Sequence, residues 1–324
     1  MSRVFFIPSV PNAPNVVGHL TERLRSTYGD EAVPVGRWGL EHKLMRDTPS
    51  CLPASAHAPN PAPRARYLQF FSISNYPKLG FIYASVGGSD DPASTTTTKD
   101  TTSSPMIMRA VPQSSSLELF KHFVRAAEPL WCHRHTVTAT GMTYEVGDFR
   151  VRIGEVRQML PFTRTRGTVL EIEWRGPSLL QSALISSRID TDSADDGDEQ
   201  EEEAIDPGVD LSYVPTDAEI DAECTQTAQI IREFWMRLAV ANKDTREAIL
   251  VPDIGKEIKA KLRQQREPGW REREVKRLQK RREAIAIEKS WGGERGGGVV
   301  ENEEDAEAGV DLARQYMEIF RFTR

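Results

Sequence analysis

The fold is decided by the stretch Tyr144-Glu145-Val146-Gly147-Asp148-Phe149-Arg150-Val151-Arg152-Ile153-Gly154-Glu155-Val156. From Phe149 onward, apolar residues alternate with arginine or glycine. This period of two is typical of a β-strand with one apolar face and one face toward solvent. The stretch Thr168–Trp174 repeats the alternation after a short link that contains arginine and glycine. We therefore predict two neighbouring antiparallel strands.

Helical spacing marks both ends of the chain. Asn15 can cap a helix that runs to about Tyr28, where Gly29 is placed to end it. Near the C-terminus, one helical stripe collects Leu312, Gln315, Tyr316, Ile319 and Phe320. This stripe predicts a last helix that packs back on the core.

Two capping-box spacings predict helices in the middle of the chain. The first, Ser115 to Glu118, opens a helix to about Trp131, and its inward residues are predicted to be Leu117, Phe120, Val124 and Ala127. The second, Thr216 to Glu219, opens a helix whose apolar positions are Ile220, Cys224, Ile231, Trp235 and Leu238.

Further strands are predicted near 36–46, 67–74, 79–85 and 106–111, with few strand–helix–strand alternations. This order favours an α+β fold with a large antiparallel sheet, barrel-like and flanked by helices. The chain has 324 residues, 39% of them hydrophobic, and a mean hydropathy of −0.49. That composition suffices for one medium barrel or sandwich plus insertions, or for two small domains.

Three segments read as long disordered or charged insertions in a single domain over residues 1–324. They lie at about 86–104, 187–215 and 255–309. The stretch Asp190–Asp206 holds ten acidic residues and no basic one, whereas Gly255–Ser290 holds thirteen Lys or Arg against six Asp or Glu. Such blocks are typical of solvated tracts and do not make the folded part a nucleic-acid binder.

The cysteines and the apolar runs limit the class of protein. Cys51, Cys132 and Cys224 form no closely spaced pair, so a disulfide framework is not expected and a reducing compartment fits. No apolar run reaches 18 residues, so no membrane span is expected. The apolar stretch at the N-terminus is too short for a signal peptide and reads as a first strand.

One pair of residues suggests an enzyme. Glu171 and Glu173 lie on the same face of a predicted strand, where they could hold a divalent metal, and Arg150 and Arg152 could face a phosphate. This arrangement would suit a triphosphate-tunnel-like barrel phosphohydrolase. The plainer interpretation is cross-strand Glu–Arg pairing on a solvated face. We favour it, because no second paired-carboxylate strand is visible.

Other chemical signals are weaker. The run Cys132-His133-Arg134-His135 offers three metal ligands but lacks the fourth that a tetrahedral site needs, so we predict a helix-to-strand junction. The glycine runs near residues 292–298 lack the ending of a phosphate loop. We expect no catalytic residue, no cofactor and no metal.

Four motifs in order resemble a known family. They are the turn Ser74–Pro77, the strand Tyr144–Val156, the strand Arg166–Trp174 and the helix Asp311–Phe320. Together they cover about half of the chain and resemble subunit 20 of the Mediator complex, the transcriptional coactivator. The residues that carry the resemblance are Tyr76, Pro77, Tyr144, Asp148, Phe149, Gly154, Gly167, Glu171, Glu173, Gln315, Tyr316, Met317 and Phe320.

The resemblance implies an antiparallel β-barrel with helices on its outside. It also implies a non-enzymatic, nuclear subunit of the Mediator head module that regulates transcription through protein contacts. Its partners would be Mediator subunit 18 and subunit 8, other head-module subunits, and also TATA-binding protein and RNA polymerase II. No membrane association and no sequence-specific nucleic-acid binding are expected. The basic run Lys276–Arg282 fits a nuclear import signal and a charged surface helix equally well.

Overall fold

The computed structural model of the chain describes residues 1–9, 16–51, 65–86, 107–127, 130–178, 215–238, 245–248, 256–267, 269, 273, 276 and 309–320. The chain divides into two compact units. The first comprises Met1–Trp174, Ile231–Val251 and Glu304–Arg324, and the second comprises Arg175–Ile230 and Pro252–Glu303. Most of the three predicted insertions lie outside the described residues, and their boundaries in a single domain stay a prediction.

The first unit is built on one antiparallel sheet of nine strands, which confirms the predicted α+β class. The strand order is β5-β4-β3-β2-β6-β7-β8-β1-β9, so β2, β6, β7 and β8 form the middle of the sheet. The strands are β1 Ser2–Pro8, β2 Val33–Asp47, β3 Arg66–Ile73, β4 Leu79–Val86, β5 Ile107–Pro112, β6 Trp131–Val146, β7 Phe149–Gln158, β8 Arg164–Trp174 and β9 Arg246–Glu247.

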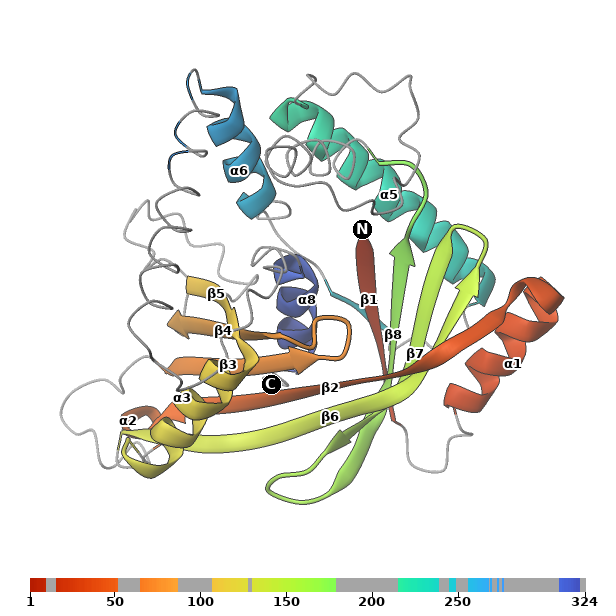
Figure 1. The fold of residues 1–324 in the computed structure, drawn as a ribbon. Coiled ribbons are helices and arrows are strands. Elements are labelled where there is room, and N and C mark those ends of the chain that lie inside the picture. The colour runs from red at the N-terminus through yellow and green to blue at the C-terminus, as the bar shows by residue number, and fades with distance from the viewer. Residues whose placement is uncertain are drawn as a thin grey trace, which may run out of the picture. The chain divides into compact units, whose positions relative to one another are not determined.

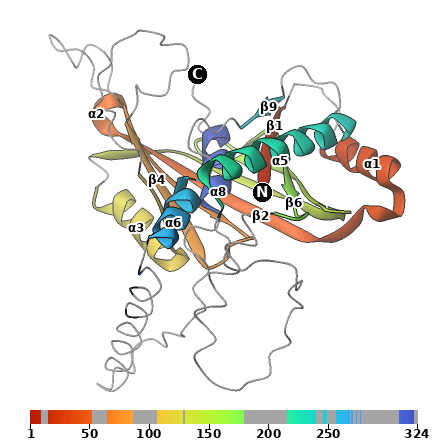
Figure 2. The ribbon, with the colours of Figure 1, turned by 90° about the horizontal axis from the view of Figure 1, so that it is seen from above.

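The sheet does not close into the barrel that the resemblance implies. Its edge strands β5 and β9 do not pair with each other. Instead, the C-terminal helix α8 (Val310–Phe320) contacts β1, β3 and β5. The helix thus lies within the curve of the sheet (Figure 1 and Figure 2), and not on its outside as expected. Side chains of α8 fill the interior that a closed barrel would fill with its own strands.

Each face of the sheet packs against helices. On the inner face, α8 shares one core cluster with side chains from β1, β2, β3, β4, β6, β7 and β8. On the outer face, helix α1 (Val16–Tyr28) and the last two turns of α5 (Asp217–Leu238) cover β1, β6, β7 and β8. The middle strands are therefore sandwiched between two layers of helix.

This sandwich corrects the prediction of a solvent-facing side on β7 and β8. Val151 and Ile153 are buried on the outer face as predicted, but Arg152 is also buried on the inner face. In β8, Leu170 and Ile172 face outward and Glu171 is fully buried inside. The period of two was read correctly, but α8 covers the side that was expected to meet water.

Helix α1 confirms its prediction, with Leu20 and Leu24 buried against the outer face and Gly29 in the left-handed region just after it. Its predicted cap, Asn15, lies outside the described residues. The short helix α2 (Thr48–Cys51) follows β2 directly.

Helix α3 (Gln113–Arg125) differs from its prediction in start, end and face. It begins after Pro112 without a side-chain cap, because the Gln113 N–H is satisfied by the carbonyl of Lys78 at 2.8 Å. It ends before Trp131, which begins β6. Phe120 packs inward as predicted, together with Phe123, on the cluster of Met45, Leu68 and Phe70. The predicted inward residues Leu117 and Val124 are instead exposed. The two rings bury more area than the aliphatic side chains would.

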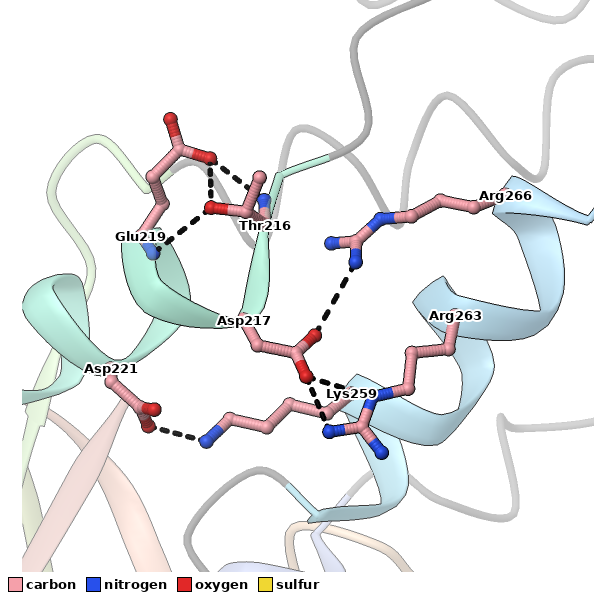
Figure 3. A network of polar contacts seen from close by, with 7 residues as sticks. All are labelled: Thr216, Asp217, Glu219, Asp221, Lys259, Arg263 and Arg266. Atoms are coloured by element: carbon pink, nitrogen blue, oxygen red, sulfur yellow. Dashed lines mark hydrogen bonds and ion pairs between the residues drawn. The ribbon is translucent and has the colours of Figure 1, made fainter.

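In the second unit, the start of α5 and helix α6 (Lys256–Arg266) join through charges (Figure 3). Thr216 and Glu219 cap each other reciprocally, which confirms the predicted capping box. Asp217 forms ion pairs with Arg263 and Arg266, and Asp221 pairs with Lys259.

Candidate functional site

The four family motifs meet at one buried polar cluster inside the curve of the sheet. Arg152 of β7 and Glu171 of β8 are directly opposite in the strand register. They form an ion pair, with side chains only 6% and 0% exposed. On the other side of the carboxylate, the hydroxyl of Tyr316 on α8 donates to Glu171 Oε2 at 2.7 Å. Both carboxylate oxygens of Glu171 are thereby engaged by protein groups.

Two more residues complete the cluster around Arg152. Glu173 pairs with Arg152 Nη2 at 2.9 Å and is partly exposed. With its side-chain oxygen turned toward Arg152, Asn75 of the β3–β4 turn accepts from the Nε at 3.1 Å. Asn75, Arg152, Glu171 and Tyr316 thus bring one residue from each motif to one place. The strand pattern predicted the cross-strand Glu–Arg pairing, which is confirmed. Its burial and the contacts with Asn75 and Tyr316 could not be read from spacing, since those residues come from distant parts of the chain.

Burial dominates the acid–base behaviour of this cluster. Desolvation raises the pKa of Glu171, and the Arg152 guanidinium opposes this shift without reversing it. Desolvation would lower the pKa of Arg152, but the carboxylates of Glu171 and Glu173 raise it overall. Desolvation and the adjacent Glu171 carboxylate raise the pKa of Tyr316 well above its usual value. The charge of Glu171 is thus paired with Arg152 inside the core, and Tyr316 engages its second oxygen.

Helix α8 is anchored to the sheet by its polar side chains as well as its apolar ones. The Gln315 amide accepts from the N–H of Val4 at 3.0 Å and donates to the carbonyl of Ser2 at 3.0 Å. It therefore pairs with β1 as a further strand residue would. Met317 and Phe320 are buried beside it in the inner cluster. The motif Gln315–Phe320 is thus a docking motif within the chain.

A histidine group lies beneath the C-terminal end of α8. The Nε2 of His135 is 3.0 Å from the carbonyl oxygen of Phe320, and the ring of His42 lies beside the rings of His135 and Phe320. Burial lowers the pKa of His42 to about 3 and that of His135 to about 4. His42 binds Gln69 through Nε2 at 2.9 Å. Both imidazoles are thus held neutral in the core at physiological pH.

The run from Cys132 to His135 forms the beginning of β6, close to the predicted helix-to-strand junction. His133 hydrogen-bonds Thr136 at 3.0 Å, and His135 is held by α8 as above. Over the residues that the structure describes, no three His, Cys, Asp or Glu side chains come together in a way that could hold a metal ion.

The remaining aromatic motif residues pack in the core. The ring of Tyr76 lies against Phe81 and against Gly309, the residue before α8. Tyr144 is buried in the outer cluster. Phe149 stacks on Phe234 of α5, with 4.2 Å between ring centroids. These residues hold the helices on the sheet.

The other motif positions lie in turns or are glycines that neighbouring segments of the chain approach closely. Asp148 is exposed in the two-residue turn between β6 and β7, and Pro77 lies in the β3–β4 turn at the rim of a shallow surface depression. At Gly154, a Cβ atom would lie 2.7 Å from the Trp38 ring, and at Gly167 it would collide with the Ile7 carbonyl. Glycine is required there because its neighbours approach so closely.

Sequence reasoning missed an exposed apolar turn between β7 and β8. Met159, Leu160 and Phe162 are 43%, 45% and 78% exposed. Arg164 and Arg166 flank this turn, and both donate to Gln158. The signal was present, because Met-Leu-Pro-Phe stands where a hairpin link is normally polar. We call Met159–Phe162 the apolar turn.

Comparison with known proteins identifies the family. Residues 1–321 match the family model described as TATA-binding related factor (TRF) of subunit 20 of Mediator complex. The chain belongs to the Mediator subunit 20 family. As a member of this family, it is a Mediator subunit with a role in the regulation of transcription, as the four motifs predicted.

Known structures add a distant likeness. The PH1012 protein from Pyrococcus horikoshii is 11% identical, with 76% of this chain and 94% of that chain covered and a TM-score of 0.34. A chain in the Schizosaccharomyces pombe Mediator head module is 11% identical, with 73% and 95% covered and a TM-score of 0.27. TM-scores below 0.5 are too low to bear on function. No curated protein matches this Mediator subunit 20 family member.

Among the helices that the structure describes, none combines the length and the apolar character needed to cross a membrane.

Proposed function

We propose that this Mediator subunit 20 family member acts without catalysis, as a nuclear scaffold of the head module that pairs with Mediator subunit 18. Subunit 8, TATA-binding protein and RNA polymerase II are the further partners we infer from the family. The observation that carries the proposal is the convergence of all four motifs on an internal ion pair. We infer that the family motifs stabilise the fold, and that exposed residues outside this cluster make the contacts with other proteins.

The engaged state of Glu171 speaks against the phosphohydrolase alternative. A metal–phosphate site needs several carboxylate oxygens open to the ion. Here Arg152 and Tyr316 take both oxygens of Glu171, and α8 fills the space that a tunnel would leave for substrate. We expect no triphosphate hydrolysis with magnesium or manganese. Triphosphate hydrolysis by the wild-type protein that disappears in the Glu171→Gln/Glu173→Gln variant would contradict this expectation.

The apolar turn is the contact surface we assign to subunit 18. Exposed Phe162, Leu160 and Met159 offer the kind of aromatic and aliphatic anchors that dominate protein interfaces. The exposed basic side chain of Arg164 beside them fits a partner surface that is apolar with an acidic rim.

A co-purification assay tests this assignment. Phe162→Ser with Met159→Ser should lower the recovery of subunit 18 at least tenfold, with the melting temperature unchanged. The matched control is Leu117→Ser with Leu119→Ser, which removes exposed apolar side chains from α3. Equal loss in both variants, or full recovery in the first, would refute the apolar turn as the contact. If the wild-type protein itself recovers no Mediator subunit from nuclear extract, the scaffold function is wrong.

A further inference from the structure

Two of the three cysteines meet at the corner where β2 ends and β6 begins. The register pairs Arg46 with Cys132, and the next residue of β2 is followed directly by α2 (Thr48–Cys51). The N–H of Thr48 donates to the carbonyl of Leu130 at 2.9 Å. This bond folds α2 back over the first residues of β6, which brings Cys51 to Cys132.

The two thiols contact each other. Cys51 is within hydrogen-bonding reach of the Cys132 thiol, and the Cys132 sulfur is also 3.4 Å from the Thr48 hydroxyl. Both cysteines lie outside any disulfide and are partly exposed, whereas Cys224 on α5 is buried, with 7% exposure. The chain therefore carries one accessible thiol pair and one buried thiol that can serve as its internal control.

We propose that Cys51 and Cys132 form a reversible disulfide when a hydroperoxide oxidises the protein. In the first step, one thiolate attacks the peroxide, the O–O bond breaks, and a sulfenic acid forms with release of water or alcohol. In the second step, the other thiol attacks that sulfur, the S–O bond breaks, and water leaves as the S–S bond forms. The two cysteines lose two electrons, which the peroxide takes up, and a dithiol reductant reverses the reaction.

The surroundings set the pH at which the pair reacts. Burial, and then the neighbouring Cys132 thiol, raise the pKa of Cys51, while Arg46 and Arg134 act in the opposite direction. Because the thiolate is the nucleophile, oxidation should be slow at neutral pH and faster at pH 9.

The disulfide would stabilise the part of the sheet that contains β3, β4 and β5. It closes a loop of roughly 80 residues that contains β3, β4, β5 and α3, and so restricts the unfolded chain. The oxidised protein should therefore unfold at a temperature about 5–10 °C higher than the reduced protein.

Thiol counting on the full chain tests the proposal. Reduced protein is treated with a few equivalents of hydrogen peroxide, denatured, alkylated with a maleimide and digested for mass spectrometry. We expect the loss of two of the three thiols, a Cys51–Cys132 cross-linked peptide, a monomer on a non-reducing gel, and full recovery with dithiothreitol. Three remaining thiols, a bond to Cys224, or a disulfide-linked dimer would overturn the proposal.

Serine variants locate the bond. Cys51→Ser and Cys132→Ser should each abolish the intramolecular cross-link and the rise in melting temperature, while Cys224→Ser should keep both. If the cross-link survives in either of the first two variants, the assignment is wrong. Should a variant fail to fold, the peptide map of the wild-type protein still decides, because it names the bonded cysteines directly.

Discussion

Helices α8 and α3 have similar lengths, belong to the same unit and contact the same sheet, yet they are buried very differently. In α8, seven of eleven residues are buried, whereas in α3 only Ser116 is buried. Helix α8 lies within the curve of the sheet, where strands surround it, and α3 lies on one side of the sheet at β3, β4, β5 and β6. Position relative to the curved sheet, more than apolar content, decides how much of a helix is buried.

The difference extends to polar residues. Because α8 is enclosed, Gln315 and Tyr316 must find partners inside, and they do so at β1 and at Glu171. On α3, Glu118 and Lys121 simply face solvent. The exposed side of α3 therefore tolerates change, while every position of α8 except the exposed Glu318 is at least partly buried.

The strongest test of this difference between α8 and α3 is to remove the large buried side chains of α8. Tyr316→Ala with Phe320→Ala should cost about 3–5 kcal/mol per ring, which is comparable to a whole domain stability of about 5–15 kcal/mol. We expect insoluble or molten protein, and the same after truncation beyond Gly309. Urea unfolding followed by circular dichroism measures the loss. A cooperative melt like that of the wild type would mean that α8 is a free tail that docks only on a partner.

The next largest effect should come from breaking the buried ion pair. Glu171→Ala removes one of the two carboxylates that pair with Arg152 and leaves the Tyr316 hydroxyl without its acceptor in the core, at a cost of about 3–5 kcal/mol. Arg152→Met with Glu171→Gln removes the charge and keeps an acceptor for Tyr316, so it should be more stable than Glu171→Ala alone. The midpoints of urea unfolding of the wild type, Glu171→Ala and the double variant measure this order of stability. If the double variant is the least stable, the charges themselves hold α8.

The histidines below α8 should make stability fall in mild acid. His42 and His135 have folded pKa values of about 3 and about 4, below the unfolded value of 6.5. Their contribution is therefore full above pH 6.5 and is lost as pH falls toward 4, because the unfolded chain binds protons first. Each histidine should cost about 1.4 kcal/mol per pH unit in that window.

Urea unfolding at pH 7, 6 and 5 measures this slope. His42→Leu should reduce the slope of the free energy of unfolding against pH by the contribution of one histidine. The pKa of His135 should stay lowered in this variant, because His133, Arg134 and Arg166 still act on it. The control is His19→Asn, at an exposed position of α1. An unchanged slope in the His42 variant would show that its imidazole is not kept neutral by burial.

The smallest effect is expected on α3. Leu117→Ala with Val124→Ala changes two side chains that are 36% and 37% exposed, so each should shift stability by less than about 0.5 kcal/mol. Differential scanning calorimetry is sensitive enough to detect a larger change. A loss near that of the α8 variant would show that the two helices are equally part of the core.

Much of the fold follows from the sequence by itself. Alternation in 149–156 and 168–174 determined two adjacent antiparallel strands, and Leu20 and Leu24 determined the inward face of α1, because strand and helix periods are local properties of the chain. The reciprocal cap of Thr216 and Glu219 was also readable, since both partners lie within one turn. The order of the four motifs along the chain also indicates the Mediator subunit 20 family.

Only the tertiary structure decided which faces are buried and which motif residues meet. Spacing placed Glu171 on one side of its strand, but whether that side meets water depends on α8, which begins 139 residues later at Val310. The same holds in part for α3, where spacing predicted that Phe120 faces inward but missed Phe123, which packs against Trp131. Burial is a property of what packs against a residue, and a local pattern carries no information on distant partners.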